Sequence, residues 1–250
     1  MIIRQLFDPE SSTYTYLLGC AATRECLLLD PVMEMMERDL RLVEELGLTL
    51  AISVETHIHA DHVTSACRLR ALTGCKVAFP AMERLDCADI AVAEGRPIHV
   101  GEIRLRPIFT PGHTDTHYGY LLEAGGFLLL FSGDALLIDG CGRTDFQNGD
   151  AETLYRSVHD KIFTLPGDTL VYPAHDYNNR HVSTVAQERE HNPRLGGGKK
   201  LAEFVQIMEQ LKLPYPDKMD IAVPANLRCG ECEAEPSACA GEKPGKSQQG

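Results

Sequence analysis

Three histidines and an aspartate stand close together at residues 56–62. His57, His59, Asp61 and His62 follow directly on an apolar run. Imidazole and carboxylate groups suit zinc, iron or manganese, and alternate spacing lets neighbouring side chains converge from one loop on one or two ions. Histidine is too uncommon for a polar surface loop to be the better interpretation of this cluster. The segment therefore predicts the active site of a metal-dependent enzyme.

Three more candidate ligands, His113, Asp134 and His175, each stand at the end of an apolar run. Taken alone, each would more often be a hydrogen-bonded structural residue. Strand ends at one edge of a sheet, however, gather their side chains into one layer, which is where ligands bind in α/β sheets. His117, close to His113, is a candidate for orienting a ligand. We expect these residues to complete the site begun at residues 56–62.

The elements that must position these residues alternate between strands and helices. Apolar runs around a polar turn at 22–25 predict a hairpin, and apolar residues at helical spacing from 36 to 46 predict a helix that ends at Gly47. A buried strand at 48–54 then precedes the histidine segment. Further helices are expected at 62–72, 151–163, 184–190 and 200–211, and further strands at 76–79, 103–109, 118–122, 127–131 and 169–172. The alternation predicts a mixed α/β chain.

Length and composition restrict the classes of function. With 250 residues, 44% of them hydrophobic, the chain can bury a sizeable core. Its 24 basic and 36 acidic residues give a formal charge of −12, which opposes general binding to nucleic acid or to an anionic membrane face. The apolar stretches are too short to cross a bilayer, and the start has no basic leader before an apolar run. We expect a soluble, cytoplasmic protein.

The cysteines and the C-terminal end give weaker signals. Nine cysteines is an odd number, and a chain that forms a core does not need disulfides, so a reducing compartment fits best. Cys229 and Cys232, with Cys239 beyond, are compatible with a zinc knuckle or a redox pair, but no second CxxC accompanies them. The composition turns polar from residue 230. We expect one catalytic domain at 1–229 and a flexible polar tail at 230–250.

Four motifs resemble those of the metallo-β-lactamase superfamily. They are HxHxDH at 57–62, Thr-Pro-Gly-His-Thr at 110–114, Ser-Gly-Asp-Ala at 132–135 and Pro-Ala-His-Asp-Tyr at 173–177. Within the superfamily the chain looks most like the persulfide dioxygenases, because segments at 4–7, 15–19, 140–147 and 222–230 are similar to theirs. The first motif alone would not separate the subfamilies, whereas Cys-Gly-Arg-Thr-Asp-Phe-Gln at 141–147 is specific.

The resemblance implies an αββα four-layer sandwich with the metal at one edge, between the sheets. It also implies one ferrous iron, Fe(II), per chain, held by His57, His113 and Asp134, and it suggests a homodimer. The remaining ligand-like residues would then lie beside the iron or form a vacant second-metal site: His59, Asp61, His62 and His175. The residues alone leave the metal count open, because every ligand needed for a two-metal hydrolase is present.

The implied reaction takes glutathione persulfide, O2 and water to sulfite and glutathione. A site of two histidines and one carboxylate leaves adjacent positions open on iron, so that the substrate sulfur and O2 are held together. Glutathione carries carboxylates, and a protein at −12 needs a local cation to bind it. Arg143 is the best-placed candidate, and an ion pair with Asp145 is its alternative role. Arg228 is a weaker candidate for a second carboxylate, and Tyr177 is a catalytic candidate whose hydroxyl points at the metal-bound sulfur.

Two other functions compete with this one. A hydrolase of the glyoxalase II type would use two metals to make a hydroxide that attacks a glutathione thioester. The short helices expected after His175 leave no room for the longer helical substrate domain of such hydrolases, and a β-lactamase is disfavoured because those enzymes are usually exported. A non-catalytic regulatory or redox relative is the alternative of another class. Such a relative would be expected to lose metal ligands. All seven candidate ligands are present: His57, His59, Asp61, His62, His113, Asp134 and His175.

Overall fold

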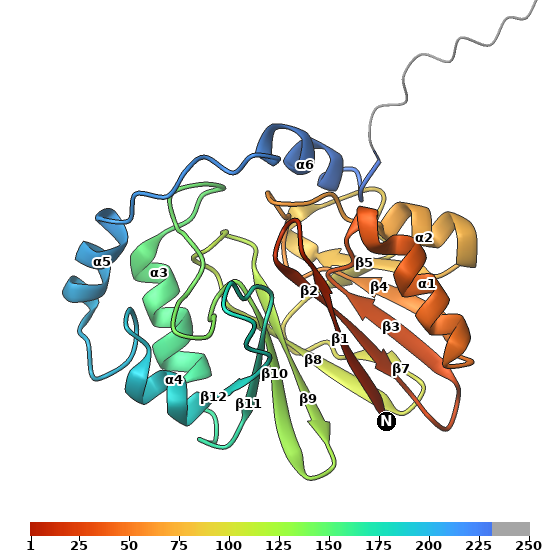
Figure 1. The fold of residues 1–250 in the computed structure, drawn as a ribbon, viewed down its shortest axis with the longest axis horizontal. Coiled ribbons are helices and arrows are strands. Elements are labelled where there is room, and N and C mark those ends of the chain that lie inside the picture. Colours follow the sequence, from red (N-terminus) through yellow and green to blue (C-terminus); the bar gives the residue numbers. More distant parts are fainter. Residues whose placement is uncertain (232–250) are drawn as a thin grey trace, which may run out of the picture.

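Two six-stranded sheets packed face to face form the protein in the computed structural model, which describes residues 1–231 (Figure 1). The first sheet has its strands in chain order: β1 (Ile2–Asp8), β2 (Thr13–Gly19), β3 (Glu25–Leu29), β4 (Thr49–Val54), β5 (Lys76–Pro80) and β6 (Ile90–Val92). The second has the spatial order β12-β11-β10-β9-β8-β7. Its strands are β7 (Ile98–Val100), β8 (Ile103–Phe109), β9 (Tyr118–Ala124), β10 (Phe127–Gly133), β11 (Leu170–Pro173) and β12 (Ser183–Thr184).

Both sheets mix parallel and antiparallel pairing. β1, β2 and β3 pair antiparallel, whereas β3 through β6 pair parallel. In the second sheet only β10 and β11 are parallel among the described pairs. Parallel strands need crossover connections, and two of these are the helices α1 (Met36–Glu45) and α2 (Ala66–Thr73). The strands β4, β10 and β11 therefore end at one edge of the sandwich, where the candidate ligands follow them.

Helices cover the outer face of each sheet. Leu28 and Leu50 of the first sheet pack with Val43 of α1 and Leu69 of α2 in one buried cluster. The second sheet is covered by α3 (Ala151–Arg156), which continues as a π-helical turn at Ser157–Ile162, by α4 (Val185–His191) and by α5 (Leu201–Glu209). Figure 1 shows the chain after α5 crossing the end of the sandwich to α6 (Met219–Asn226), which lies on the side of the first sheet.

The space between the sheets holds the largest buried cluster. Tyr16 and Leu29 from the first sheet meet Tyr120 and Phe131 from the second. The Tyr16 ring lies edge-on to Phe131, and its hydroxyl donates to the carbonyl of Pro173 over 2.6 Å, so that its one polar group is satisfied inside the core. Helix, sheet, sheet and helix form four layers, as the predicted αββα sandwich requires.

Most elements were predicted close to their observed bounds, with three differences. The helix expected from residue 62 begins at Ala66, because residues 62–65 form an irregular segment whose polar groups bond elsewhere. The strands β1, β6, β7 and β12 were not predicted. The helix α6 was also missed, and it contains Pro224. Two 3-10 turns, Met33–Met35 and Ala81–Glu83, complete the described secondary structure.

The structure bears on two further expectations, one about the C-terminal tail and one about the cysteines. The tail predicted at 230–250 lies outside the described residues except for residues 230 and 231, and so do Cys232 and Cys239. The chain was expected not to need disulfides, but Cys87 and Cys229 are bonded across 142 residues of sequence. Five other cysteines in the described part carry free thiols. None of the described helices is both long and apolar enough to cross a membrane.

Candidate active site

The histidine segment is held where β4 ends. The backbone N–H of Thr56 donates to a carboxylate oxygen of Asp30 over 2.8 Å, and the carbonyl of Thr56 accepts from the N–H of Tyr118 over 2.9 Å. The loop that carries His57 is therefore tied to β3 on one side and to β9 of the other sheet on the other. Asp30 is buried and has a positive φ of 50°. Aspartate adopts this backbone conformation more readily than most residues, because its short side chain can bond to nearby backbone groups.

His57, His113 and Asp134 come together from three strand ends. One ligand atom of each lies within 4.8 Å of the others, and the Nε2 atom of His113 is 3.3 Å from Asp134 Oδ2. His57 and Asp134 are buried, and the side chain of His113 is only 12% exposed. The structure thus brings together the three residues that the resemblance assigns to iron.

Hydrogen bonds behind the two histidines leave their Nε2 atoms free. A carbonyl can only accept, so the contact of 2.7 Å between His113 Nδ1 and the Arg143 carbonyl puts the proton on Nδ1. The Thr56 hydroxyl donates to the Asp30 carboxylate and therefore accepts from His57 Nδ1 over 2.8 Å. Each ring then presents an Nε2 lone pair toward the group, as metal-binding histidines do.

The charge state of the group also fits a cation. Burial and the neighbouring imidazoles of His59 and His113 hold the pKa of His57 well below its usual range, which keeps the ring neutral. Asp134 Oδ1 is buried with no hydrogen-bond partner among the described residues. A buried carboxylate oxygen without a donor is costly unless a cation lies beside it. The three residues therefore fit a divalent metal of the kind that accepts imidazole and carboxylate.

His117 supports Asp134 from behind. The backbone N–H of Asp134 donates to His117 Nε2 over 3.0 Å, so the single N–H of this neutral ring is on Nδ1, 2.9 Å from the Thr110 hydroxyl. Gly133 makes room for this contact, because a Cβ there would lie 2.3 Å from His117 Nε2 and its φ is +54°. His117 thus fixes the backbone of a proposed ligand, as its spacing indicated.

The other ligand-like residues form a second group beside the first. Ligand atoms of His59, Asp61 and His62 lie within 4.8 Å of one another. His175 faces both groups, with its Nε2 atom 3.5 Å from Asp134 Oδ1 and 3.7 Å from Asp61 Oδ2. Burial opposes ionisation of Asp61, but His62 and His175 outweigh it and hold the pKa of that carboxyl well below its usual range. The geometry therefore preserves the ligands of a second-metal site.

His59 has a different environment from the other histidines. Its Nε2 atom lies 3.1 Å from Asp30 and 3.3 Å from Glu55, both buried. Burial lowers the pKa of His59, but Asp30 and Glu55 outweigh it and raise the pKa well above its usual range. Asp30 and Glu55 were not among the predicted site residues. Asp30 could have been suspected from its position directly after an apolar strand, which is the signal that marked the other ligands.

A cavity of about 650 Å³ opens beside the metal-binding group. It is lined by the candidate ligands His113, Asp134, Asp61 and His175 and by the predicted substrate residues Arg143 and Tyr177. Tyr177 is 72% exposed, and its ring lies parallel to that of His175. Arg228, the other predicted carboxylate partner, is exposed and is not among the residues that line the cavity.

The arginines of this cavity differ in how they are already paired. Arg143 bonds to Asp145 and to the Pro214 carbonyl, and its guanidinium lies 4.5 Å from the centre of the Phe146 ring. Arg180 is paired with Asp139 and Asp176.

Arg194 also lines the cavity, and within the described residues it has no carboxylate partner. Its NH1 group donates to the Cys141 carbonyl over 2.8 Å. It was missed because no motif marks it, and only the fold brings residue 194 to residue 141.

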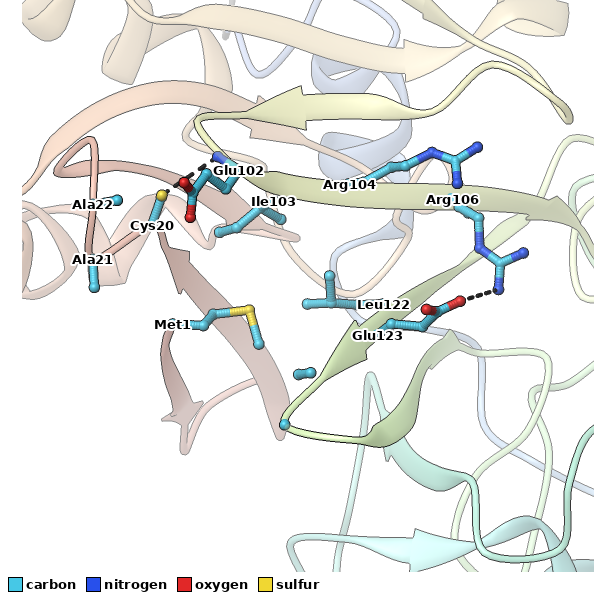
Figure 2. Close-up of a pocket in the computed structure, with 12 residues that line it drawn as sticks. Met1, Cys20, Ala21, Ala22, Glu102, Ile103, Arg104, Arg106, Leu122 and Glu123 are labelled. Carbon is cyan, nitrogen blue, oxygen red and sulfur yellow. Dashed lines mark hydrogen bonds and ion pairs between the residues drawn. The ribbon is translucent and has the colours of Figure 1, made fainter.

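A second cavity, of about 400 Å³, lies at the opposite end of the sandwich, where β8 begins and β9 ends. Figure 2 shows the residues that line it. It is lined by Met1, Cys20, Glu102 and the turn between β9 and β10. Hydrogen bonds from Thr23 and from the Glu102 backbone lower the pKa of Cys20 to about 7. None of the predicted site residues is among those that line this cavity, so the candidate active site lies at the larger one.

Comparison with known proteins identifies the family of this chain. A family model described as the metallo-beta-lactamase superfamily matches residues 8–175. The mitochondrial persulfide dioxygenase ETHE1 of Bos taurus is 51% identical over 231 residues, which are 92% of this chain and 89% of that protein. A crystal structure of ETHE1 from Myxococcus xanthus superposes with a TM-score of 0.88 at 51% identity, covering 92% of this chain and 100% of that chain.

This chain belongs to the persulfide dioxygenase family of the metallo-β-lactamase superfamily. The resemblance drawn from the motifs is thereby confirmed, and so is the αββα fold. The hydrolase alternative has a more distant relative: the hydroxyacylglutathione hydrolase of Rhodospirillum rubrum is 35% identical over 175 residues, 69% of this chain and 66% of that protein.

Proposed function

We propose that this enzyme is an iron-dependent dioxygenase that oxidises glutathione persulfide with O2 and water to sulfite and glutathione. One observation carries the proposal: His57, His113 and Asp134 converge beside a cavity in a chain half identical to a curated persulfide dioxygenase over 92% of its length. We propose one Fe(II) per chain, held by these three residues. Iron held by these residues would supply the redox chemistry that joins O2 to sulfur.

The residues around the group orient its members. Asp30 and Thr56 fix the His57 ring, the Arg143 carbonyl fixes the His113 ring, and His117 fixes Asp134 through its backbone. Such supporting contacts decide whether ligand atoms converge at the right distances. We propose that His59, Asp61, His62 and His175 act as neighbours of the iron site and do not bind a second metal.

The cavity supplies the contacts for the thiol carrier. Glutathione carries two carboxylates, and we propose that Arg194 and Arg143 bind them. Arg194 has the greater free capacity, because Arg143 already shares its guanidinium with Asp145. Tyr177 lines the same cavity beside His175, and we propose that its hydroxyl donates to the sulfur that reacts. Arg228 is the weaker candidate, since it lies outside the residues that line the cavity.

Three further properties stay predictions. We propose a homodimer, a cytoplasmic location and one catalytic domain at 1–229. The bovine relative is named as a mitochondrial protein, and this location is stated for that relative alone. The formal charge of −12 continues to disfavour nucleic acid and anionic membranes as partners.

The experiment that tests the function combines metal counting with turnover. Protein reconstituted anaerobically with Fe(II) should hold about one iron per chain, consume O2 when given glutathione persulfide, and release sulfite. The same protein without added persulfide is the control. Two metals per chain, together with hydrolysis of a glutathione thioester and no uptake of O2, would establish the hydrolase alternative instead.

A further inference from the structure

A single buried amide near the end of the described chain binds the backbone of the metal-binding loop. The Asn226 side-chain amide donates to the carbonyls of His59 and His62, each over 2.9 Å. Its oxygen accepts from the N–H of Thr64, also over 2.9 Å. Asn226 is fully buried at the end of α6, and its partners lie more than 160 residues earlier in the chain. The loop is thus tied to the far end of the sequence.

The three contacts use both donors of the Asn226 amide and one of its two acceptor sites. An amide NH2 group has two protons, one for each carbonyl, and the amide oxygen meets the one N–H. No other side chain of this size offers two donors and an acceptor: aspartate lacks the donors, and leucine lacks both kinds of group. Loss of the amide would leave two buried carbonyls and one N–H without partners, at about 1 to 3 kcal/mol each.

The loop has matching support at its other end, which shows what Asn226 adds. Asp30 binds the backbone of Thr56, one residue before His57. The Gln147 amide donates to the Ile58 carbonyl over 2.7 Å. Asn226 holds the half of the loop that follows, so that His57 lies in a backbone segment fixed from both sides.

The segment that carries Asn226 is itself anchored three residues later. Cys229 is bonded to Cys87, and its carbonyl accepts from the N–H of Cys67 at the start of α2 over 3.0 Å. Gly230 then packs directly on the loop, because a Cβ there would lie 2.0 Å from the Thr64 carbonyl oxygen, and its φ is +88°. Beyond residue 231 the described chain ends. The disulfide is therefore the covalent attachment nearest to Asn226.

We propose that Asn226 is a positioning residue for the metal-binding loop and that the Cys87–Cys229 disulfide keeps it in place. The amide acts through the loop backbone on His57 and does not touch the metal. The disulfide limits how far α6 can move from the loop. Oxidation state at this pair and metal affinity at the site are then linked, although neither cysteine is a ligand.

The disulfide can be reduced by ordinary thiol–disulfide exchange. Cys87 is partly exposed and Cys229 is buried, so a small thiolate attacks the Cys87 sulfur and releases Cys229 as a thiolate. A second thiol then displaces the mixed disulfide. Two thiols are consumed and leave as one disulfide, and both cysteines end as thiols. The covalent attachment of the α6 segment is then lost, and only packing and hydrogen bonds hold Asn226 in place.

The first test uses Asn226→Asp in the full chain, with Fe(II) as the probe. The variant keeps the acceptor for Thr64 and replaces both donors by an oxygen. We expect its dissociation constant for Fe(II), measured anaerobically by competition with a chelator, to rise at least tenfold. Amide hydrogen exchange should accelerate at residues 56–64. Asn226→Ser serves the same purpose if the aspartate variant does not fold.

A matched control separates positioning from general stability. Val158 is fully buried under the second sheet, in a cluster that does not include the loop. Val158→Ala should lower the melting temperature and leave the Fe(II) dissociation constant within twofold of the wild-type value. If an Asn226 variant folds and binds Fe(II) as the wild type does, the positioning role is excluded. These readouts need no turnover, so they stand whether or not the proposed reaction is correct.

The second test addresses the disulfide. Peptide mapping of protein purified without thiols should recover Cys87 and Cys229 in one linked peptide. Cys87→Ser should weaken Fe(II) binding and accelerate exchange at 56–64, by less than Asn226→Asp does. Cys20→Ser, which removes a free thiol at the opposite end of the sandwich, should change neither. Unlinked peptides, or a Cys87→Ser variant with wild-type Fe(II) binding and exchange, would remove the disulfide from the proposal.

Discussion

Gly142 offers a sharp test of the proposed metal group, because it touches two of its members. Its backbone N–H donates to the Asp134 carbonyl over 2.7 Å. A Cβ at this position would lie 2.6 Å from that carbonyl oxygen and 2.7 Å from His113 Nδ1. The φ of Gly142 is not in the left-handed region, so alanine fits the backbone and the clash with the site is the only problem.

The size of the effect follows from these distances. Ordinary Cβ contacts begin near 3.4 Å, so the His113 ring must move by about 0.7 Å. A movement of that size lengthens the 2.7 Å contact from His113 Nδ1 to the Arg143 carbonyl and weakens the bond from Gly142 to Asp134. At about 1 kcal/mol for each bond, the loss is at most about 2 kcal/mol. The Fe(II) dissociation constant of Gly142→Ala should then rise by up to about thirtyfold.

Gly140 is the matched control in the same loop. A Cβ at Gly140 would have its nearest neighbour, Leu137 Cβ, at 3.9 Å, and its φ is not positive. Gly140→Ala should therefore bind Fe(II) as the wild type does, by the same chelator competition. Wild-type affinity in Gly142→Ala would show that His113 and Asp134 do not set the metal affinity, and the proposed ligand group would have to be abandoned.

Four further predictions concern the metal, the cavity and the pH dependence of stability. Chelation of the metal should lower the melting temperature, because iron at a hundred times its dissociation constant stabilises the fold by about 2.7 kcal/mol; an unchanged melting curve would contradict a bound metal. His113→Ala should abolish iron retention, and full iron occupancy would exclude His113 as a ligand. Arg194→Ala should raise the KM for glutathione persulfide at least tenfold and more than Arg143→Ala does. A KM equal to that of the wild type in Arg194→Ala would show that other residues bind the carboxylates. Burial, opposed by Arg38, raises the pKa of Asp39 to about 6. Because the unfolded chain ionises this carboxyl at lower pH, stability should fall by about 3 kcal/mol at most as pH rises from 4 to 7, and Asp39→Asn should remove that slope in urea unfolding.

The sequence predicted the parts of the site that are local. His57 and its neighbours form one short loop, and His113, Asp134 and His175 each follow an apolar strand. Strand ends at one edge meet whatever the details of the fold, so these residues were found without knowing which strands are neighbours. The helix α1 was predicted because its apolar spacing and Gly47 are strong local signals.

The missed features depend on contacts between distant residues. Nothing near Asn226 in sequence indicates that it binds the backbone at His59, and nothing near Arg194 indicates Cys141 as its neighbour. The pairing of Cys87 with Cys229 cannot be read from an odd number of cysteines, because spacing does not encode partners. The helix α6 was missed because Pro224 argues locally against a helix.

The division of the metal group between the two sheets has a consequence for synthesis of the protein. His57 follows a strand of the first sheet, whereas His113 and Asp134 follow strands of the second. A chain emerging from the ribosome therefore displays the whole histidine loop well before the other two proposed ligands are made. Asn226 emerges nearly a hundred residues after Asp134, so the loop acquires its last support close to the end of translation. With the role proposed for Asn226, iron would bind at full affinity only to the finished chain.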